Sequence, residues 1–128
     1  MPFTRVFLRA GKPEAYRRAI LDGLYRSMRD CFEVPEDDRF MVIAEIDQSN
    51  FSYGSNYLDV SRSEDLVIVQ ITANNTRSTT QKKALYRRIV ERLAENPGLR
   101  PEDIFINLVE VKPENWSFGL GLAQYAPD

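Results

Sequence analysis

The residue of this sequence best suited to chemistry is Pro2, directly after the initiator methionine. An initiator methionine is usually excised when a small residue follows it, and its removal would leave proline as a free secondary amine. An α-amino group titrates at about 7.7–8.0, and a hydrophobic pocket favours its neutral form. Such an amine can act as a general base or attack a carbonyl carbon, and its protonated form can act as an acid. If Met1 is retained, the same nitrogen is an amide without basicity.

The composition of the chain narrows the remaining chemistry. The 128 residues include no histidine and one cysteine, Cys31. The lack of histidine excludes a Ser-His-Asp triad, a Cys-His pair and an imidazole metal site. A single cysteine forms no internal disulfide, which fits a reducing cytoplasm. Acid–base catalysis would therefore depend on carboxylates, tyrosines, lysines or the N-terminus.

Charge and hydropathy also limit partners and location. The 17 basic side chains are opposed by 19 acidic ones, so the chain has no basic tail for binding nucleic acid. No apolar run approaches the roughly 20 residues that span a bilayer. The N-terminus lacks the apolar core of a signal peptide. We therefore expect a cytoplasmic protein that binds neither nucleic acid nor membranes.

Two further groups could assist an amine at Pro2. Glu36, Asp37 and Asp38 stand beside Arg39 ahead of a predicted strand, where such a cluster is otherwise a solvated turn. Arg77 stands at a predicted strand-to-helix junction in ANNTRSTTQ. A guanidinium there can bind a substrate carboxylate with two hydrogen bonds, helped by the N–H groups of the helix start. A plain surface arginine would give the same pattern.

The elements that must position these residues follow from hydropathy patterns and turn residues. Aromatic, β-branched and other apolar runs predict four strands, at residues 3–8, 40–46, 66–72 and 104–111. The polar segment 47–65 contains a shorter candidate strand at 57–60. Apolar residues at three- and four-residue spacing predict a helix from Pro13 to Cys31, which Val34-Pro35 closes. A second helix is predicted from a capping box of Ser78 and Gln81 to Asn96-Pro97-Gly98.

The order strand-helix-strand occurs twice, at about residues 2–48 and 66–111. Pro-Glu-Asp precedes the second strand at 35–37 and the fourth at 101–103. Right-handed crossovers would place both helices on one face of a shared, mixed four-stranded sheet. We expect one two-layer α+β domain over residues 1–128, built from duplicated β-α-β units. The runs at 66–72 and 104–111 look buried on both faces, which predicts oligomerisation.

The tail at 112–128 carries Trp116, Phe118 and Tyr125 between glycines. Gly119 and Gly121 form no dinucleotide fingerprint, because no strand-to-helix turn follows and the third glycine is missing. Aromatic residues with glycines at a C-terminus pack more often against a subunit edge than against a ligand, and they can do both.

Four stretches of the chain resemble the tautomerase superfamily, specifically its malonate semialdehyde decarboxylase-like branch. They are Met-Pro at the start, FEVPEDDRF, RSTTQKKALYRRIVERL and ENWSFGLGLAQY, in which WSFG-x-G-x-AQ is the most specific string. The resemblance implies a tautomerase-like fold, a homotrimer, and catalysis by the amino-terminal proline without a cofactor or metal.

The resemblance also implies roles for individual residues. Pro2 matches the catalytic proline, Asp38 the active-site aspartate and Arg77 a substrate-binding arginine. Asn75 stands where some members carry a second arginine, which weakens the case for the same substrate. Trp116 and Phe118 match the aromatic wall of the pocket. The expected substrate-binding residues are therefore Asn75, Trp116, Phe118 and Tyr125.

The reaction implied by the resemblance is decarboxylation of a small 3-oxo acid such as malonate semialdehyde. The same residues would support keto–enol tautomerisation of phenylpyruvate-like 2-oxo acids, or hydration of an acetylenic or unsaturated acid. A non-catalytic trimer that binds small carboxylic acids is a further alternative, since it would need Arg77 but no free amine.

Overall fold

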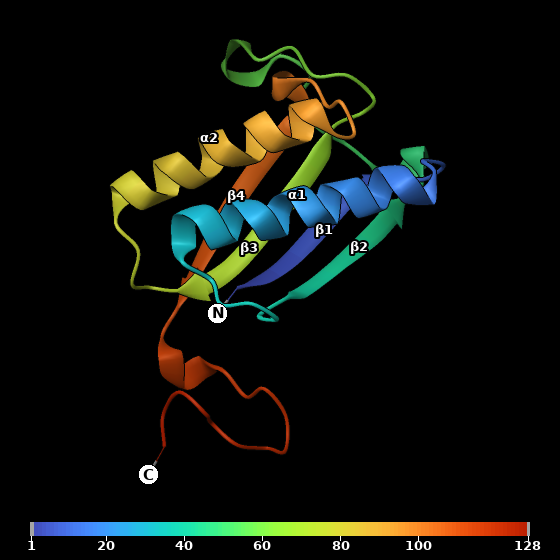
Figure 1. The fold of residues 1–128 in the computed structure, drawn as a ribbon. Coiled ribbons are helices and arrows are strands. Elements are labelled where there is room, and N and C mark those ends of the chain that lie inside the picture. Colours follow the sequence, from blue (N-terminus) through green and yellow to red (C-terminus); the bar gives the residue numbers. More distant parts are fainter. Residues whose placement is uncertain (1, 128) are drawn as a thin grey trace.

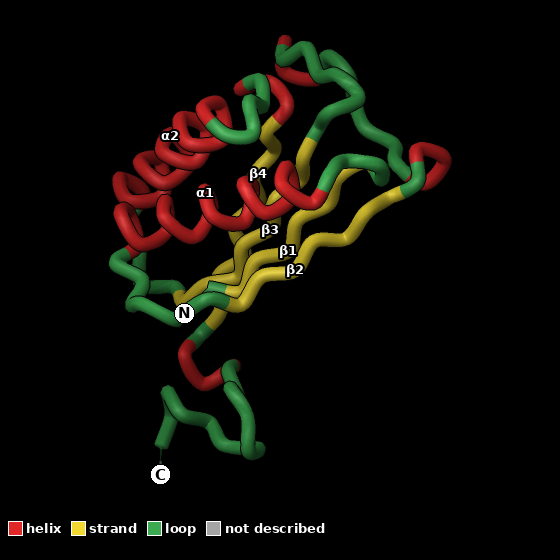
Figure 2. The backbone as a smooth tube through the Cα atoms, turned by 45° about the vertical axis from the view of Figure 1, so that its right-hand side comes forward, coloured by secondary structure: helices red, strands yellow, loops and turns green. Residues whose placement is uncertain are grey.

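Four strands form one mixed sheet, and two helices lie side by side across one of its faces (Figure 1). This computed structural model describes residues 2–127. Its elements are β1 (Phe3–Arg9), α1 (Glu14–Phe32), β2 (Phe40–Ile46), β3 (Val67–Asn74), α2 (Thr79–Glu95) and β4 (Ile104–Val111). In the order β2-β1-β3-β4, β1 is parallel to β2 and antiparallel to β3, and β3 is parallel to β4. The predicted two-layer α+β class is confirmed (Figure 2).

The helix ends follow the local signals in the sequence. At the start of α2, the Ser78 hydroxyl accepts a hydrogen bond from the Gln81 N–H at 3.2 Å. The Gln81 side chain accepts one from the Ser78 N–H at 2.9 Å, so the predicted capping box is present. Helix α1 ends at Phe32, where Glu33 adopts the left-handed conformation (φ 54°). This turn leads the chain back toward the start of β2.

The hydrophobic core lies between the helices and the sheet. Its fully buried side chains come mainly from α1, α2, β1 and β3, and include Val6, Ile20, Leu24, Val69, Ile71, Leu85 and Ile89. The helices approach closely at Gly23, because a Cβ at that position would lie 2.8 Å from Leu93 Cδ2. This close packing fixes both helices over the two central strands.

The other face of the sheet has no helical layer. Four apolar side chains of the outer strands remain 37–50% exposed there: Phe40, Val42, Phe105 and Val109. Within one chain, β3 alternates between buried and half-buried residues, and β4 is mostly half-buried or exposed. The burial on both faces expected for 66–72 and 104–111 is therefore not present in a single chain, since the helices cover only one side. An apolar face of this kind is typical of a surface that a partner covers.

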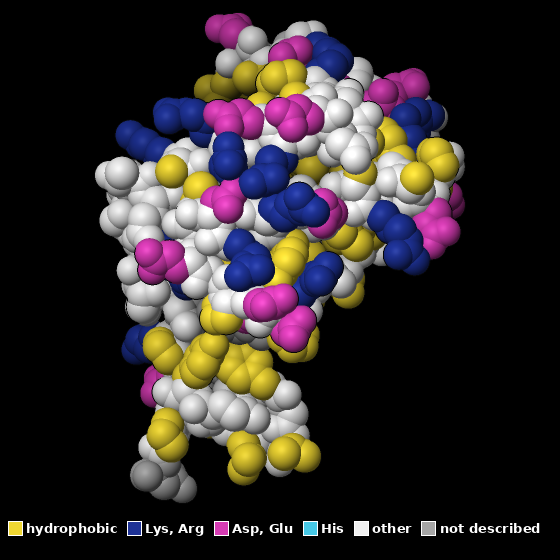
Figure 3. Space-filling model, viewed as in Figure 1, with side chains coloured by type: hydrophobic (Ala, Val, Ile, Leu, Met, Phe, Trp, Pro, Cys, Tyr) yellow, Lys and Arg dark blue, Asp and Glu magenta, His cyan; other side chains and the backbone are white. Residues whose placement is uncertain are grey.

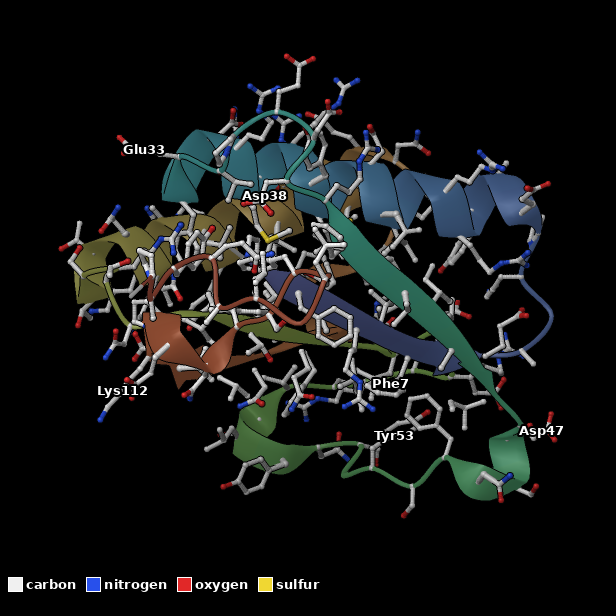
Figure 4. The ribbon with its side chains drawn as sticks, turned by 90° about the horizontal axis from the view of Figure 1, so that it is seen from below. Phe7, Glu33, Asp38, Asp47, Tyr53 and Lys112 are labelled. Carbon is white, nitrogen blue, oxygen red and sulfur yellow. The ribbon has the colours of Figure 1, made fainter. Side chains whose placement is uncertain are left out.

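The segment between β2 and β3 passes beneath this open face, where Figure 4 shows Tyr53 near Phe7. The strand predicted at 57–60 is wrong, since Tyr57–Asp59 is a short 3-10 helix in which Leu58 has a φ of 58°. The Arg62 guanidinium donates hydrogen bonds to three carbonyl oxygens of this loop at 3.0–3.2 Å. These bonds satisfy backbone groups that a neighbouring strand would otherwise bind.

The two Pro-Glu-Asp sequences occupy equivalent places, but their aspartates differ. Asp37 lies in an exposed turn, whereas Asp103 is 1% exposed. Asp103 accepts hydrogen bonds from the Ser63 N–H (2.7 Å) and hydroxyl (2.6 Å). At the same end of the sheet, two basic side chains contact Asp65: Lys12 at 2.7 Å and Arg9 at 3.1 Å. Hydrogen bonds and ion pairs therefore close the end at which β3 and β4 begin.

Candidate active site

The register of the strands brings the predicted site residues to one end of the sheet. Phe3, the first residue of β1, pairs with the first residue of β2 and with Thr72 near the end of β3. Pro2 therefore lies next to the loop that enters β2 and next to the turn that leaves β3. Strand β4 is parallel to β3 and ends there as well, so the tail starts at the same place. We call this end of the sheet the Pro2 corner.

Pro2 itself is buried, immediately before β1. A free amine held among protein atoms rather than in water favours its neutral form, because burial disfavours the charged one. The removal of Met1 concerns a residue outside the described part of the chain.

Asp38 differs from the other two carboxylates of its cluster in how far it is buried. Asp38 is half-buried, whereas Glu36 and Asp37 are exposed. The Asp38 N–H donates to the Pro35 carbonyl at 3.2 Å, which shapes the loop. Burial raises the pKa of the Asp38 carboxyl above its usual value, and the positive charge of Arg77 partly opposes this rise. Asp38 can therefore hold a proton at a higher pH than an exposed aspartate.

Arg77 lies in the turn between β3 and the start of α2, where α1 orients it. Its guanidinium donates a hydrogen bond to the Phe32 carbonyl at the end of α1 (2.9 Å), and its central carbon lies 4.8 Å from the Phe32 ring centroid. These two contacts hold the plane of the guanidinium, which has five N–H donors in all. The charge of Arg77 partly opposes the rise in the pKa of Asp38 and of the Tyr125 hydroxyl, so one cation acts on both groups.

The tail leaves β4 and turns back below the Pro2 corner (Figures 1 and 2). The Trp116 and Phe118 rings stack with centroids 5.4 Å apart, and Phe118 meets Tyr125 edge to face at 4.9 Å. Burial, and then the charge of Asp38, raise the pKa of Tyr125, which Arg77 partly opposes. The three predicted tail residues thus form one continuous aromatic group beside a carboxyl and a guanidinium.

Two polar residues outside the predicted set position this aromatic group. Asn74, the last residue of β3, accepts a hydrogen bond from Trp116 Nε1 at 2.7 Å. Gln124 accepts one from the Phe118 N–H (2.9 Å) and donates one to the Gly119 carbonyl (3.1 Å), which closes the tail loop. Gln124 stands inside ENWSFGLGLAQY, a stretch that carries the family resemblance, whereas Asn74 lies just before RSTTQKKALYRRIVERL. Nothing in the local sequence of either residue indicates these contacts.

Asn75 lies at the same corner, but it is exposed. Its backbone N–H donates to the Val111 carbonyl at 3.0 Å, which continues the pairing of β3 with β4. Asn75 is thus two residues from Arg77, on a backbone that the sheet holds in place. A longer, charged side chain at this position would add a second cation to the corner.

The Pro2 corner of a single chain remains open to solvent. Tyr125 is 43% exposed and Leu122 is 56% exposed.

A hollow of about 360 Å³ lies at the other end of the strands, lined by Arg9, Tyr53 and Glu64 among others. Over residues 2–127, no three His, Cys, Asp or Glu side chains gather as metal ligands do. Within that range no helix has the length and apolar character to cross a membrane.

Known proteins resemble this chain over most of its length. The family model described as "Tautomerase enzyme" matches residues 38–119. Two proteins of Bacillus subtilis (strain 168) align along nearly their whole length. Probable tautomerase YusQ is 42% identical over 97% of this chain and 98% of its own. Probable tautomerase YrdN is 30% identical over 98% of this chain and 96% of its own.

Solved structures show the same fold. Malonate semialdehyde decarboxylase, studied in wild-type, mutant and inactivated forms, superposes with a TM-score of 0.90 at 28% identity, covering 96% of this chain and 95% of the other. FG41 malonate semialdehyde decarboxylase inhibited by 3-bromopropiolate gives 0.90 at 31% identity, with 96% and 93% covered. A symmetric trimer of fused 4-OT gives 0.80 at 16% identity, with 97% and 99% covered, which is a likeness of fold.

Proposed function

Since this chain belongs to the tautomerase superfamily and is similar to its malonate semialdehyde decarboxylase-like branch, we propose that it is an enzyme in which the Pro2 amine acts on small oxo acids without a cofactor. The proposed reaction is decarboxylation of malonate semialdehyde or a similar 3-oxo acid. The observation that carries the proposal is the convergence of a buried Pro2, a half-buried Asp38 with a raised pKa, and an oriented Arg77 at one corner of the sheet.

In this proposal Arg77 binds the substrate carboxylate. Its plane is already held against Phe32, so the remaining N–H groups can form charge-assisted hydrogen bonds with little loss of side-chain freedom. The aromatic group of the tail then faces the short carbon chain. Such fixed binding orients the bond between the carboxylate and C2 out of the plane of the 3-oxo group, as cleavage requires.

The Pro2 amine turns the 3-oxo group of the substrate into an acceptor for the electrons of the breaking bond. As an ammonium ion it donates a hydrogen bond to the 3-oxo oxygen; as a neutral amine it attacks that carbonyl carbon and forms an iminium ion with loss of water. The C1–C2 bond breaks, carbon dioxide leaves, and the bonding electron pair moves to C2 as an enol or enamine. Protonation at C2, with hydrolysis of the iminium ion in the second route, yields the aldehyde. Asp38 positions the required proton or water and tunes the amine.

The proposed enzyme is a homotrimer. The apolar face that carries Phe40, Val42 and Phe105 needs a cover that the two helices do not give. The Pro2 corner is open in one chain, so a neighbouring chain would also exclude water from it. The trimeric fused 4-OT, which has this fold, illustrates one such assembly. The expected mass in solution is that of three chains, and light scattering that finds a stable monomer at micromolar concentration would contradict this assembly.

A second reaction has its own support. Asn75 gives the corner one cation fewer than a decarboxylase with a second arginine, and the two Bacillus relatives are named as probable tautomerases. Keto–enol tautomerisation of a phenylpyruvate-like acid needs Arg77 for the carboxylate and Pro2 to move one proton between carbon and oxygen. No carbon dioxide leaves in this tautomerisation, so the reaction depends less on a second positive charge.

The test compares one polypeptide before and after removal of Met1 by methionine aminopeptidase, with intact mass as the record. After removal, malonate semialdehyde and phenylenolpyruvate should be turned over, and 3-bromopropiolate should add mass to the N-terminal peptide. The Met1-retaining chain is the matched control and should do neither. Equal rates for the two forms would show that the Pro2 amine is not the catalyst and would overturn the proposal. No turnover of either acid by the processed chain would overturn it as well and would favour a small-acid-binding protein.

The Pro2→Ala variant, processed to a free alanine amine, gives a second test. A primary amine still accepts a proton, but its basicity and rigidity differ from those of proline, so we expect a small residual activity. The measurement is steady-state kinetics on both acids. Wild-type rates in this variant would show that the secondary amine is not the catalyst.

A further inference from the structure

A second cationic site lies on the helix side of the molecule, apart from the residues assigned to catalysis above. A hollow of about 640 Å³ is formed there by α1, α2 and the loop before β2. Four arginines line it, with two aspartates and one tyrosine. Figure 3 shows Lys and Arg side chains gathered over this face, interspersed with Asp and Glu. The excess of positive charge is local, because the whole chain has a net charge of −2. We call this site the arginine hollow.

The four arginines fall into two pairs. Arg26 forms an ion pair with Asp22 at 3.1 Å, and Arg92 forms one with Asp30 at 2.6 Å, so both carboxylates of the hollow are already engaged. Arg29 and Arg39, the second pair, form no ion pair with any residue in the described range 2–127. Their two charges are the uncompensated part of the site.

The uncompensated pair is arranged around one buried ring. The guanidinium carbon of Arg39 lies 4.3 Å from the Tyr25 ring centroid, and that of Arg29 lies 5.9 Å from it. Tyr25 is 8% exposed, and its hydroxyl accepts a hydrogen bond from the Asp37 N–H at 3.3 Å. Burial and this hydrogen bond together fix the position of the ring. A guanidinium stacked on a ring keeps the N–H donors at its edge for another partner.

From these contacts we infer that the arginine hollow binds a small molecule through a compact dianionic group, namely a phosphate. Arg29 and Arg39 bind the phosphate oxygens, while Arg26 and Arg92 offset the charges of Asp22 and Asp30, the two carboxylates of the hollow. Planar guanidinium groups suit phosphate because they donate two parallel hydrogen bonds. The volume lies within the roughly 300–1,000 Å³ of small-molecule sites. Since the hollow is open, binding should weaken as salt rises.

The site does not depend on the proposed function. None of Pro2, Asp38, Arg77 or the tail aromatics lines it, and a chain without a free amine would bind phosphate equally well. Arg39 is nonetheless adjacent in sequence to Asp38, so activity is left out of the test and binding is measured directly.

The experiment is a titration of the whole chain with inorganic phosphate, then with phenyl phosphate, followed by NMR at pH 8 and constant ionic strength. We expect saturable shifts at the amides of residues 25–29 and 37–39. Arg29→Gln and Arg39→Gln should each weaken binding by about tenfold, the lower end of the range for a lost charge-assisted hydrogen bond. The matched control is Arg18→Gln, an exposed arginine of α1 paired with Glu14 at 2.9 Å, which should bind as the wild type does.

Three results would overturn the site: shifts that do not saturate, variants of Arg29 and Arg39 that bind as tightly as the Arg18 control, or equal displacement by chloride at the same ionic strength. If Arg39→Gln does not fold, Arg39→Lys replaces it. That variant keeps the charge but loses the two-pronged donor, so binding should again weaken, by several-fold. A tighter dissociation constant for phenyl phosphate than for inorganic phosphate would assign the site to a phosphate ester rather than to the free ion.

Discussion

Replacing Arg77 with alanine tests the proposed substrate contact. The contacts of Arg77 predict the magnitude of two effects, one on catalysis and one on stability. The variant has no guanidinium to bind the substrate carboxylate, so it loses a charge-assisted hydrogen bond worth roughly 1.5–3 kcal/mol. That corresponds to a fall of about 10- to 150-fold in kcat/KM. The change should appear with every acidic substrate, because the carboxylate is common to all of them.

The same substitution removes contacts within the protein. Arg77 donates to the Phe32 carbonyl at 2.9 Å and lies over the Phe32 ring, so we expect a loss of about 1–2 kcal/mol in unfolding free energy. Arg17→Ala is the matched control, because Arg17 also donates to a backbone carbonyl, that of Lys12, at 2.6 Å. Both variants should lose stability in urea denaturation, but only the Arg77 variant should lose activity.

The assay is steady-state turnover of malonate semialdehyde and phenylenolpyruvate by the chain without Met1, well below its melting temperature. The reasoning is refuted if Arg77→Ala keeps kcat/KM within a factor of two of the wild type for both acids. A fall of equal size in the Arg17 variant would also refute it, since the loss would then follow stability rather than substrate binding.

Three other substitutions test separate parts of the structure. Asn75→Arg should raise decarboxylation more than tautomerisation, measured as the ratio of the two kcat/KM values; an unchanged ratio would contradict the inferred effect of charge. Because the pKa of Asp38 is raised in the folded chain, the wild type loses unfolding free energy as pH rises from about 3.9 through that raised pKa. Asp38→Asn should therefore become more stable relative to the wild type over this interval in urea titrations, while its kcat/KM falls. Gly23→Ala should cost about 1–3 kcal/mol, since the new Cβ would lie 2.8 Å from Leu93 Cδ2, and an unchanged urea midpoint would show that the helices separate freely.

Local patterns predicted the elements of the fold well, because each element carries its own signal. The capping box at Ser78 and the apolar, β-branched runs at 3–8 and 66–72 needed no distant partner to be visible. The candidate strand at 57–60 failed because its residues find no partner strand; Arg62 binds the loop carbonyls instead. Which strand ends meet at the Pro2 corner was not predicted; it follows from the observed pairing of β1 with β2 and β3.

Contacts across long stretches of sequence could not be predicted in this way. The hydrogen bond between Asn74 and Trp116 joins residues 42 positions apart, and neither residue type indicates it. The hydrogen bond from the Arg77 guanidinium to Phe32 spans 45 positions, and its acceptor is a backbone carbonyl, which every residue has. Such contacts depend on tertiary structure alone, and they determine where the predicted side chains point.

The pairing of two β-α-β units gives the sheet two like ends, and only one of them can hold a terminal amine. Leu66 precedes β3 as Pro2 precedes β1, but the Leu66 nitrogen is a peptide amide that donates to the Ser63 carbonyl at 3.3 Å. The second end therefore has no α-amino group. At that end buried Asp103 instead holds the loop between the units through its two hydrogen bonds with Ser63. Under the proposed function each chain carries one catalytic α-amine for two structural units, so a titration of the assembly with 3-bromopropiolate should count chains rather than units.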